Sequence, residues 1–144
     1  MFKHYSILWA AYAILITAAL FGLEIAEGNK ITTIEYYGLR NMGPIYLFML
    51  SALAVVLYPI VCLPLTMLLG RFVRLMVLRM IIYAVLGGTA GYYIFHGMYD
   101  YGEGYFIRGY GLDENTGVLV FGAAGLLYGW IDHYMRQQKK PGTR

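Results

Sequence analysis

Charged side chains along this chain are separated by four long apolar stretches. Each stretch lies between two consecutive charged residues and holds 17 to 30 uncharged positions. The four windows are residues 4–23, 41–70, 80–99 and 115–131. A helix needs about 20 residues, within a range of about 17–25, to cross the hydrocarbon core of a bilayer. Each window is therefore long enough for one membrane-spanning helix.

The pattern favours membrane helices over the buried helices of a soluble all-α protein. Soluble helices normally keep a polar face, on which charges return every turn or two. Backbone polar groups in lipid must be hydrogen-bonded within their own segment, so the windows should be helical. The first window could also be a signal peptide, but its apolar run exceeds the usual 7–15 residues, and we interpret it as a retained span. We predict one all-α domain over residues 1–144, with transmembrane helices at 5–23, 45–69, 80–98 and 117–134.

Composition supports a membrane protein and argues against a nucleic-acid-binding domain. Hydrophobic residues make up 60% of the chain and charged residues 13%, against roughly 25% charged in soluble domains. The net charge is only +3. A nucleic-acid-binding domain would show a basic stripe on a folded surface, whereas these basic residues punctuate apolar runs. We therefore expect no nucleic-acid partner.

The distribution of basic residues predicts the orientation. If the chain starts in the cytoplasm, eight of its eleven Lys and Arg residues fall in cytoplasmic segments, and seven of its eight acidic residues fall outside. Short loops rich in Lys and Arg stay on the cytoplasmic side of a membrane. We predict that both termini are cytoplasmic, and that the two longer loops, 24–43 and 99–117, are extracytoplasmic.

Arg71, Arg74 and Arg79 lie in the connection between the second and third predicted spans. Basic residues beside a bilayer attract anionic head groups, at about 1 kcal/mol each. They also act as topology anchors whose side chains extend to the interface. We favour the anchor role and keep an anionic-lipid site as the alternative.

Small residues and prolines predict how the spans pack. The third and fourth spans carry glycines at small-xxx-small spacing, a pattern that allows close helix contact in lipid. These glycines are Gly87, Gly91, Gly125 and Gly129. We expect a tight antiparallel hairpin between the two spans, with homodimerisation as the alternative. In the second span, Pro59 and Pro64 should bend the helix.

The two outer loops carry carboxylates, glycines and tyrosines. Residues 31–37 have strand-like composition, and residues 105–110 could pair with them in a short extracellular sheet. Such a cap would suit the binding of a peptide or another membrane protein. A solvated connection is the alternative.

Residues able to support catalysis or metal binding are sparse. Cys62 is the single cysteine, so no intrachain disulfide can form. No nucleotide-binding, zinc-protease or hydrolase motif occurs in the sequence. We expect no enzyme activity, cofactor or metal. Asp132 can pair with Arg136 at i,i+4.

Ionisable residues near the ends of the spans are the remaining candidates for ligand or ion binding. Glu24 follows the first span, and His96 and Asp100 end the third. They could form a proton- or cation-linked site, although solvated interfacial groups are the favoured interpretation. No span carries an ionisable residue near its centre, where one would mark a functional site.

These observations predict a small non-enzymatic, multi-pass plasma-membrane protein that acts by binding a partner in the membrane or at its outer face. An accessory or immunity-type role fits this description. The expected partners are membrane lipids, together with another membrane protein or a membrane-active peptide, and a homo-oligomer is a further option. The alternative is a subunit of a small oligomeric transporter or channel.

Overall fold

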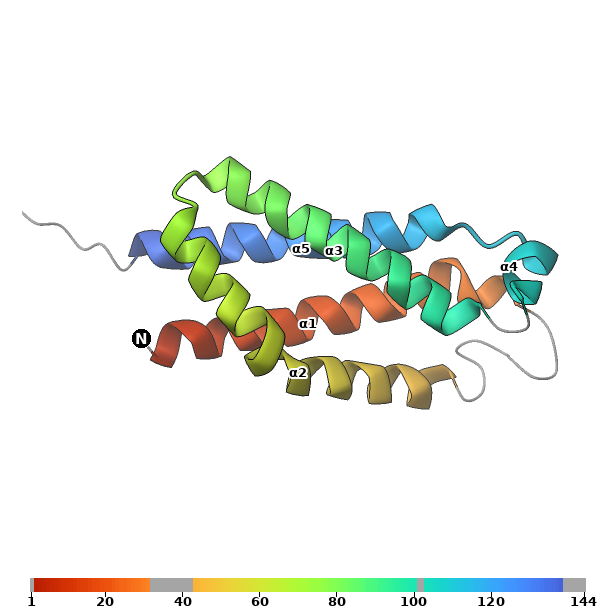
Figure 1. Ribbon diagram of the computed structural model, residues 1–144. Coiled ribbons are helices and arrows are strands. Elements are labelled where there is room, and N and C mark those ends of the chain that lie inside the picture. The colour runs from red at the N-terminus through yellow and green to blue at the C-terminus, as the bar shows by residue number, and fades with distance from the viewer. Residues whose placement is uncertain (1, 32–42, 101–102, 139–144) are drawn as a thin grey trace, which may run out of the picture.

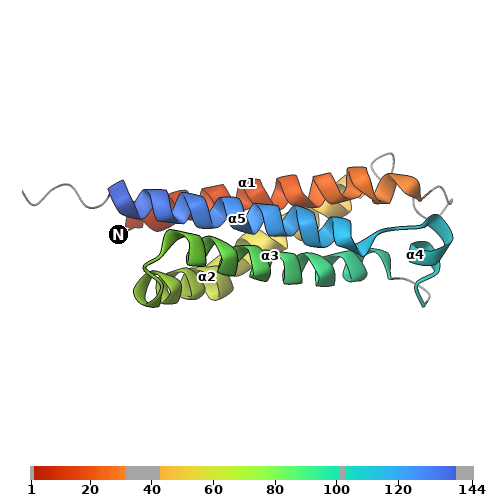
Figure 2. The ribbon, with the colours of Figure 1, turned by 90° about the horizontal axis from the view of Figure 1, so that it is seen from above.

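The computed structural model describes residues 2–31, 43–100 and 103–138, and all regular secondary structure within these residues is helical, without a strand. Four long helices lie lengthwise beside one another (Figures 1 and 2). The elements are α1 (Phe2–Ala26), the 3-10 turn η1 (Gly28–Lys30), α2 (Gly43–Phe72), α3 (Met76–Tyr99), the short α4 (Tyr105–Tyr110) and α5 (Glu114–Gln138). The predicted all-α class is confirmed, and each predicted span lies within a long helix.

Three of these helices, α1, α2 and α3, are long and apolar enough to cross a membrane. The fourth long helix, α5, has 25 residues, as many as α1, but it begins and ends with polar residues. Its N-terminal turn contains Glu114, Asn115 and Thr116, and its last turn contains Arg136. In this polarity α5 differs from α1, α2 and α3, which are more apolar.

The helices α3 and α5 run antiparallel and form the closest contact in the bundle (Figure 1). The four glycines at small-xxx-small spacing lie at this contact: Gly87, Gly91, Gly125 and Gly129. A Cβ atom at Gly125 would overlap the backbone of Tyr83, and one at Gly87 would overlap the carbonyl of Phe121. Backbone atoms cannot move aside as a flexible side chain can, so glycine is required for this approach.

The long helix α2 bends, and its packing partner differs from that of the other long helices. It packs chiefly against α1, whereas α1 and α3 both pack against α5. Proline has no backbone N–H, so Pro59 leaves the carbonyl of Val55 without its helical partner. The indole Nε1 of Trp9 on α1 donates to that carbonyl at 3.0 Å. The bend is therefore stabilised by α1, and it turns part of α2 away from α3 (Figure 1).

The prediction of a short extracellular sheet is wrong for its second strand, residues 105–110. Residues 105–110 form the helix α4, and residues 32–37 of the first strand lie outside the described residues. Gly104 and Gly111 flank α4 with φ angles of 79° and 62°, in the left-handed region that glycine adopts easily. Phe106, Ile107 and Tyr110 pack on the core at helical spacing. Tertiary packing therefore outweighs the strand propensity of these residues.

Candidate functional site: a buried polar cluster and the adjoining cavity

A group of polar residues, most of them buried, joins the four long helices at the end of the bundle that holds the N-terminus. We call it the Asp132 cluster, and each helix contributes to it. Its members are His4 of α1, Thr66 of α2, Arg79 of α3, and Asp132 and Arg136 of α5. Thr66 and Asp132 are fully buried, and His4 and Arg79 are nearly so.

The carboxylate of Asp132 is the centre of this cluster. Arg136 Nε donates to Asp132 Oδ1 at 2.9 Å, one helical turn away, which confirms the predicted i,i+4 pair. Arg79 Nη1 donates to Asp132 Oδ2 at 3.5 Å, and His4 Nε2 lies 3.6 Å from Oδ1. Arg136 also donates to the backbone carbonyl of Thr66 at 3.0 Å. A buried carboxylate requires such partners, since desolvation of an unpaired charge is very costly.

Basic groups outnumber acidic groups in this cluster. Two guanidinium groups, those of Arg79 and Arg136, face the single carboxylate of Asp132. Arg79 also donates to the carbonyl of Val73 in the α2–α3 connection. Its Nε atom is buried and has no hydrogen-bond partner among the described residues. The cluster therefore keeps an excess of positive charge and one unused donor.

Hydroxyl groups extend the polar region from the cluster toward the middle of the bundle. The Thr66 hydroxyl lies 3.0 Å from the Tyr128 hydroxyl, which lies 2.6 Å from that of Tyr58. The ring of Tyr83 packs edge-on against Tyr128, with centroids 5.1 Å apart. The Tyr83 hydroxyl is buried beside the Thr66 hydroxyl. The three tyrosines and Thr66 therefore form a band of hydroxyl groups next to the cluster.

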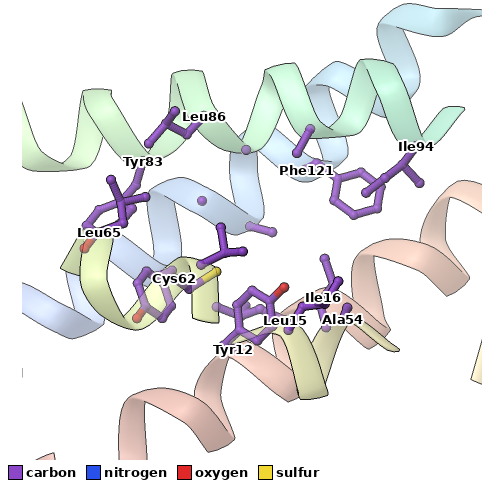
Figure 3. Close-up of a pocket in the computed structure, with 17 residues that line it drawn as sticks. Tyr12, Leu15, Ile16, Ala54, Cys62, Leu65, Tyr83, Leu86, Ile94 and Phe121 are labelled. Carbon is purple, nitrogen blue, oxygen red and sulfur yellow. The ribbon is translucent and has the colours of Figure 1, made fainter. Parts of the chain in front are cut away.

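Beyond these tyrosines the bundle encloses a cavity of about 420 Å³. Figure 3 shows side chains from all four long helices facing it, with Tyr83 and Leu65 at one end and Ile94 at the other. Most of the lining is aliphatic or aromatic, and the side chains that carry a polar atom are Tyr12, Cys62, Tyr83 and Tyr128. The volume is within the roughly 300–1,000 Å³ typical of ligand pockets.

The cavity opens sideways, between α2 and α3. Its lining residues Leu57 and Val61 of α2 are 42% and 58% exposed, and Leu86 of α3 is 42% exposed. Phe121 and Tyr128 on α5, which line the opposite wall, are buried. If the bundle lies in a membrane, this opening faces the lipid rather than either aqueous phase.

A second group of buried polar residues lies at the α4 end of the bundle. Tyr99 of α3 donates to Glu24 of α1 at 2.6 Å. Glu27 accepts bonds from the Thr116 hydroxyl at 2.7 Å and from the Asp113 backbone N–H at 3.0 Å, next to the start of α5. Acceptors near a helix N-terminus satisfy its free N–H groups. These contacts tie α1 to α3 and α5.

The structure separates the three residues proposed as a ligand or ion site. His96 lies near Asp100, with Nδ1 and Oδ2 3.7 Å apart, and its Nε2 lies 3.0 Å from Glu114. Glu24 bonds elsewhere, to Tyr99, and is fully buried, so the interpretation of Glu24 as a solvated interfacial group is wrong. No group of His, Cys, Asp and Glu suited to a metal ion occurs within the described ranges.

The three arginines predicted as anchors lie in different environments. Arg71 and Arg74 are exposed in and beside the α2–α3 connection, as an anchor or a lipid-binding residue would be. Arg79 is buried in the Asp132 cluster and directs its guanidinium into the bundle. Sequence reasoning missed the cluster as a whole because His4 and Thr66 carry no local signal of their distant partners. The spacing of Asp132 and Arg136 was the one available indication.

The fold and the cluster define an all-helical protein in which three helices are long and apolar enough to span a membrane. Comparison with protein-family models, with curated proteins and with solved structures found no match to the chain.

Proposed function

We propose that this chain is a non-enzymatic, multi-pass plasma-membrane protein that acts by binding a partner within the bilayer. The observation that carries the proposal is the apolar cavity that opens between α2 and α3. A sideways opening is reached from the lipid phase, so the partner should be soluble in the membrane. An accessory or immunity-type role at the membrane fits such binding.

We further propose four spans, with both termini in the cytoplasm. The support for a fourth span is that α5 lies antiparallel along α3 and carries no charged residue from position 115 to 131. The support for the orientation is the positive charge at the N-terminal end of the bundle. The exposed Arg71 and Arg74 lie at this end, together with Arg136 on α5.

The distribution of fixed contacts supports binding between α2 and α3. The helices α1, α3 and α5 are tied together at the α4 end through Glu24 and Glu27. Within the described residues, α2 is bonded to α5 through Thr66 and through the Tyr58–Tyr128 hydroxyl pair, and to α1 at Val55. The helix α2 packs chiefly against α1 and only weakly against α3, which favours binding between α2 and α3.

A transporter subunit is the second candidate, because a carboxylate, that of Asp132, is fully buried within the helix bundle. Buried ionisable residues in membrane helices often belong to ion or proton pathways. Because two arginines bind Asp132, its carboxylate is better explained as part of a fixed ion pair than as a group that exchanges ions or protons. An ion flux in reconstituted vesicles that His96→Ala or Glu24→Gln abolishes would support transport instead.

Site-directed photo-crosslinking tests the proposal. A photoreactive amino acid is placed at Val61 or Leu86, which line the opening, and at Ile14 or Leu119 as controls. The control positions are 70% and 71% exposed and do not line the cavity. We expect one product of defined mass from positions 61 and 86 in cells, and none from positions 14 and 119. The same products at all four positions would refute binding at the opening.

A further inference from the structure

Charged side chains are divided unequally between the two ends of the bundle. The start of α1, the α2–α3 connection and the end of α5 lie together at one end (Figures 1 and 2). Within the described residues, this end holds five basic side chains and a single carboxylate, that of Asp132, whereas the α4 end holds two basic side chains and six carboxylates. The five basic residues are Lys3, Arg71, Arg74, Arg79 and Arg136. The end that holds the N-terminus is therefore strongly positive.

Arg71 and Arg74 present part of this charge to the outside. Both residues are exposed, and neither forms an ion pair with another described residue. The Asp132 carboxylate cannot neutralise them, because it is fully buried and already bound by Arg79 and Arg136. Two guanidinium groups are therefore available to an anion that does not belong to the described part of the chain.

The buried arginines of the Asp132 cluster fix the backbone that carries the two exposed ones. Arg79 donates to the carbonyl of Val73, at the start of the α2–α3 connection. Arg136 donates to the carbonyl of Thr66 at 3.0 Å, and its guanidinium packs against Gly70, where a Cβ atom would overlap it. These contacts hold the connection to α3 and α5. Side chains on a fixed backbone lose less conformational freedom when they bind a ligand, so this arrangement favours binding.

Apolar side chains alternate with the exposed arginines. Phe72 and Leu75 follow Arg71 and Arg74 in the sequence, and they are 74% and 69% exposed. At a membrane surface, arginine side chains extend to the head groups while neighbouring apolar side chains enter the acyl region. A soluble acidic partner that bound the arginines alone would leave Phe72 and Leu75 in water. The alternation therefore favours a lipid as the source of the anion.

We propose that Arg71 and Arg74 bind the phosphate of an anionic phospholipid, with Phe72 and Leu75 among its acyl chains. Guanidinium groups bind phosphate through paired, charge-assisted hydrogen bonds. A zwitterionic phospholipid also carries a cation, which two arginines disfavour. The inference rests on the proposed membrane location, but not on the cavity or on the partner that the cavity binds. The supporting observations are two exposed arginines without a described acidic partner, on a fixed connection that also exposes apolar side chains.

Native mass spectrometry of the full chain in detergent tests this assignment. The probes are phosphatidylglycerol and phosphatidylcholine with identical acyl chains, so that they differ only in the head group. We expect phosphatidylglycerol to bind about thirtyfold more tightly, which corresponds to about fivefold for each of the two arginines. Added salt should reduce this preference, because it screens exposed charges. Equal binding of the two lipids, or a preference that salt leaves unchanged, would overturn the proposal.

Arg71→Gln and Arg74→Gln locate the site. Each variant should bind phosphatidylglycerol about fivefold more weakly, and the double variant should bind both lipids equally. Arg108→Gln is the matched control, because Arg108 is also exposed but lies in α4 at the opposite end. An equal loss in Arg108→Gln would replace the local site by a general effect of net charge. A preference that persists in the double variant would exclude these two arginines as the site.

Thermal unfolding in detergent without lipid controls for folding. The double variant should unfold within about 2 °C of the native chain, since exposed residues without a partner contribute little to stability. Phosphatidylglycerol should then raise the melting temperature of the native chain and not that of the double variant, because a ligand stabilises only the state that binds it. The same rise in both proteins would overturn the assignment of the site.

The phosphate can be attributed to a lipid or to a soluble compound by competition. Glycerophosphoglycerol is the head group of the probe without its acyl chains, and it should compete weakly because it makes no contact with Phe72 or Leu75. Competition as strong as that of phosphatidylglycerol would overturn the lipid in favour of a soluble phosphate compound. Stronger competition by a polyglutamate peptide would overturn it in favour of an acidic protein.

The outcomes separate this inference from the proposed function. If phosphatidylglycerol is preferred while positions 61 and 86 give no crosslinked product, the lipid site stands and partner binding at the opening of the cavity fails. If those positions crosslink to a partner while the two lipids bind equally, the lipid site fails and partner binding stands. If neither result is obtained, both proposals fail.

Discussion

Replacement of Asp132 by asparagine should destabilise the bundle strongly while it leaves the volume of the side chain almost unchanged. The carboxylate is fully buried and accepts from Arg136 Nε at 2.9 Å and from Arg79 Nη1 at 3.5 Å. Asparagine presents one oxygen and no charge. Two guanidinium groups would then lack their common counter-ion.

The magnitude follows from how far each arginine can move. Removal of one partner from a buried ion pair typically costs about 3–5 kcal/mol. The Arg136 side chain is 27% exposed and can partly rehydrate, whereas that of Arg79 is 5% exposed and cannot. We therefore expect about 3 kcal/mol, at the lower end of that range. For a chain of this length, that loss corresponds to a fall in melting temperature of about 10 °C.

The assay is thermal unfolding of the purified protein in detergent, followed by circular dichroism or by intrinsic fluorescence. Asp100→Asn is the matched control, because Asp100 faces His96 at 3.7 Å with a side chain 45% exposed. An exposed pair of this kind contributes at most about 1 kcal/mol. If Asp132→Asn unfolds within about 2 °C of the native protein, the Asp132 cluster does not hold the four helices together.

The remaining predictions concern helix packing and topology. Gly125→Ala places a methyl group against the backbone of Tyr83 and should cost about 1–3 kcal/mol of unfolding free energy, whereas Gly97→Ala on α3, with open space around it, should stabilise by up to about 1 kcal/mol. Equal effects in chemical unfolding would contradict the packing described for α3 and α5. For topology, Leu75→Cys and Tyr105→Cys are compared in a background without the native cysteine, since both positions are well exposed, at 69% and 62%. An impermeant thiol reagent should label position 105 on intact cells and position 75 only after permeabilisation, and the reverse pattern would exclude the proposed orientation.

Much of the helical architecture could be predicted from the pattern of charges. Long uncharged windows place the helices, because a charge in a lipid-facing or buried position is costly and each window must satisfy its own backbone. The glycine spacing in α3 and α5 likewise indicated a close contact, since only backbone approach brings such helices together. The bend in α2 followed from Pro59, although the donor that stabilises it, Trp9, lies 46 residues from Val55, whose carbonyl it binds.

The segment around α4 shows where local sequence patterns were insufficient to predict the structure. Residues 105–110 have the composition of a strand, yet they form the helix α4, because Gly104 and Gly111 allow turns at both ends and the apolar side chains find the core. Burial of Glu24 was equally hidden, since its partner Tyr99 lies 75 residues away.

The sequence by itself determined that the chain is helical, where its long helices lie and which helix bends, because these properties depend on charges, prolines and glycines within one segment. Only the tertiary structure decided that Arg79 turns inward to Asp132, that His4 and Thr66 join them, and that a cavity opens between α2 and α3. The reason is physical. Pairing of buried charges and the shape of an internal space depend on side chains from four helices at once, and no spacing along a single helix records them.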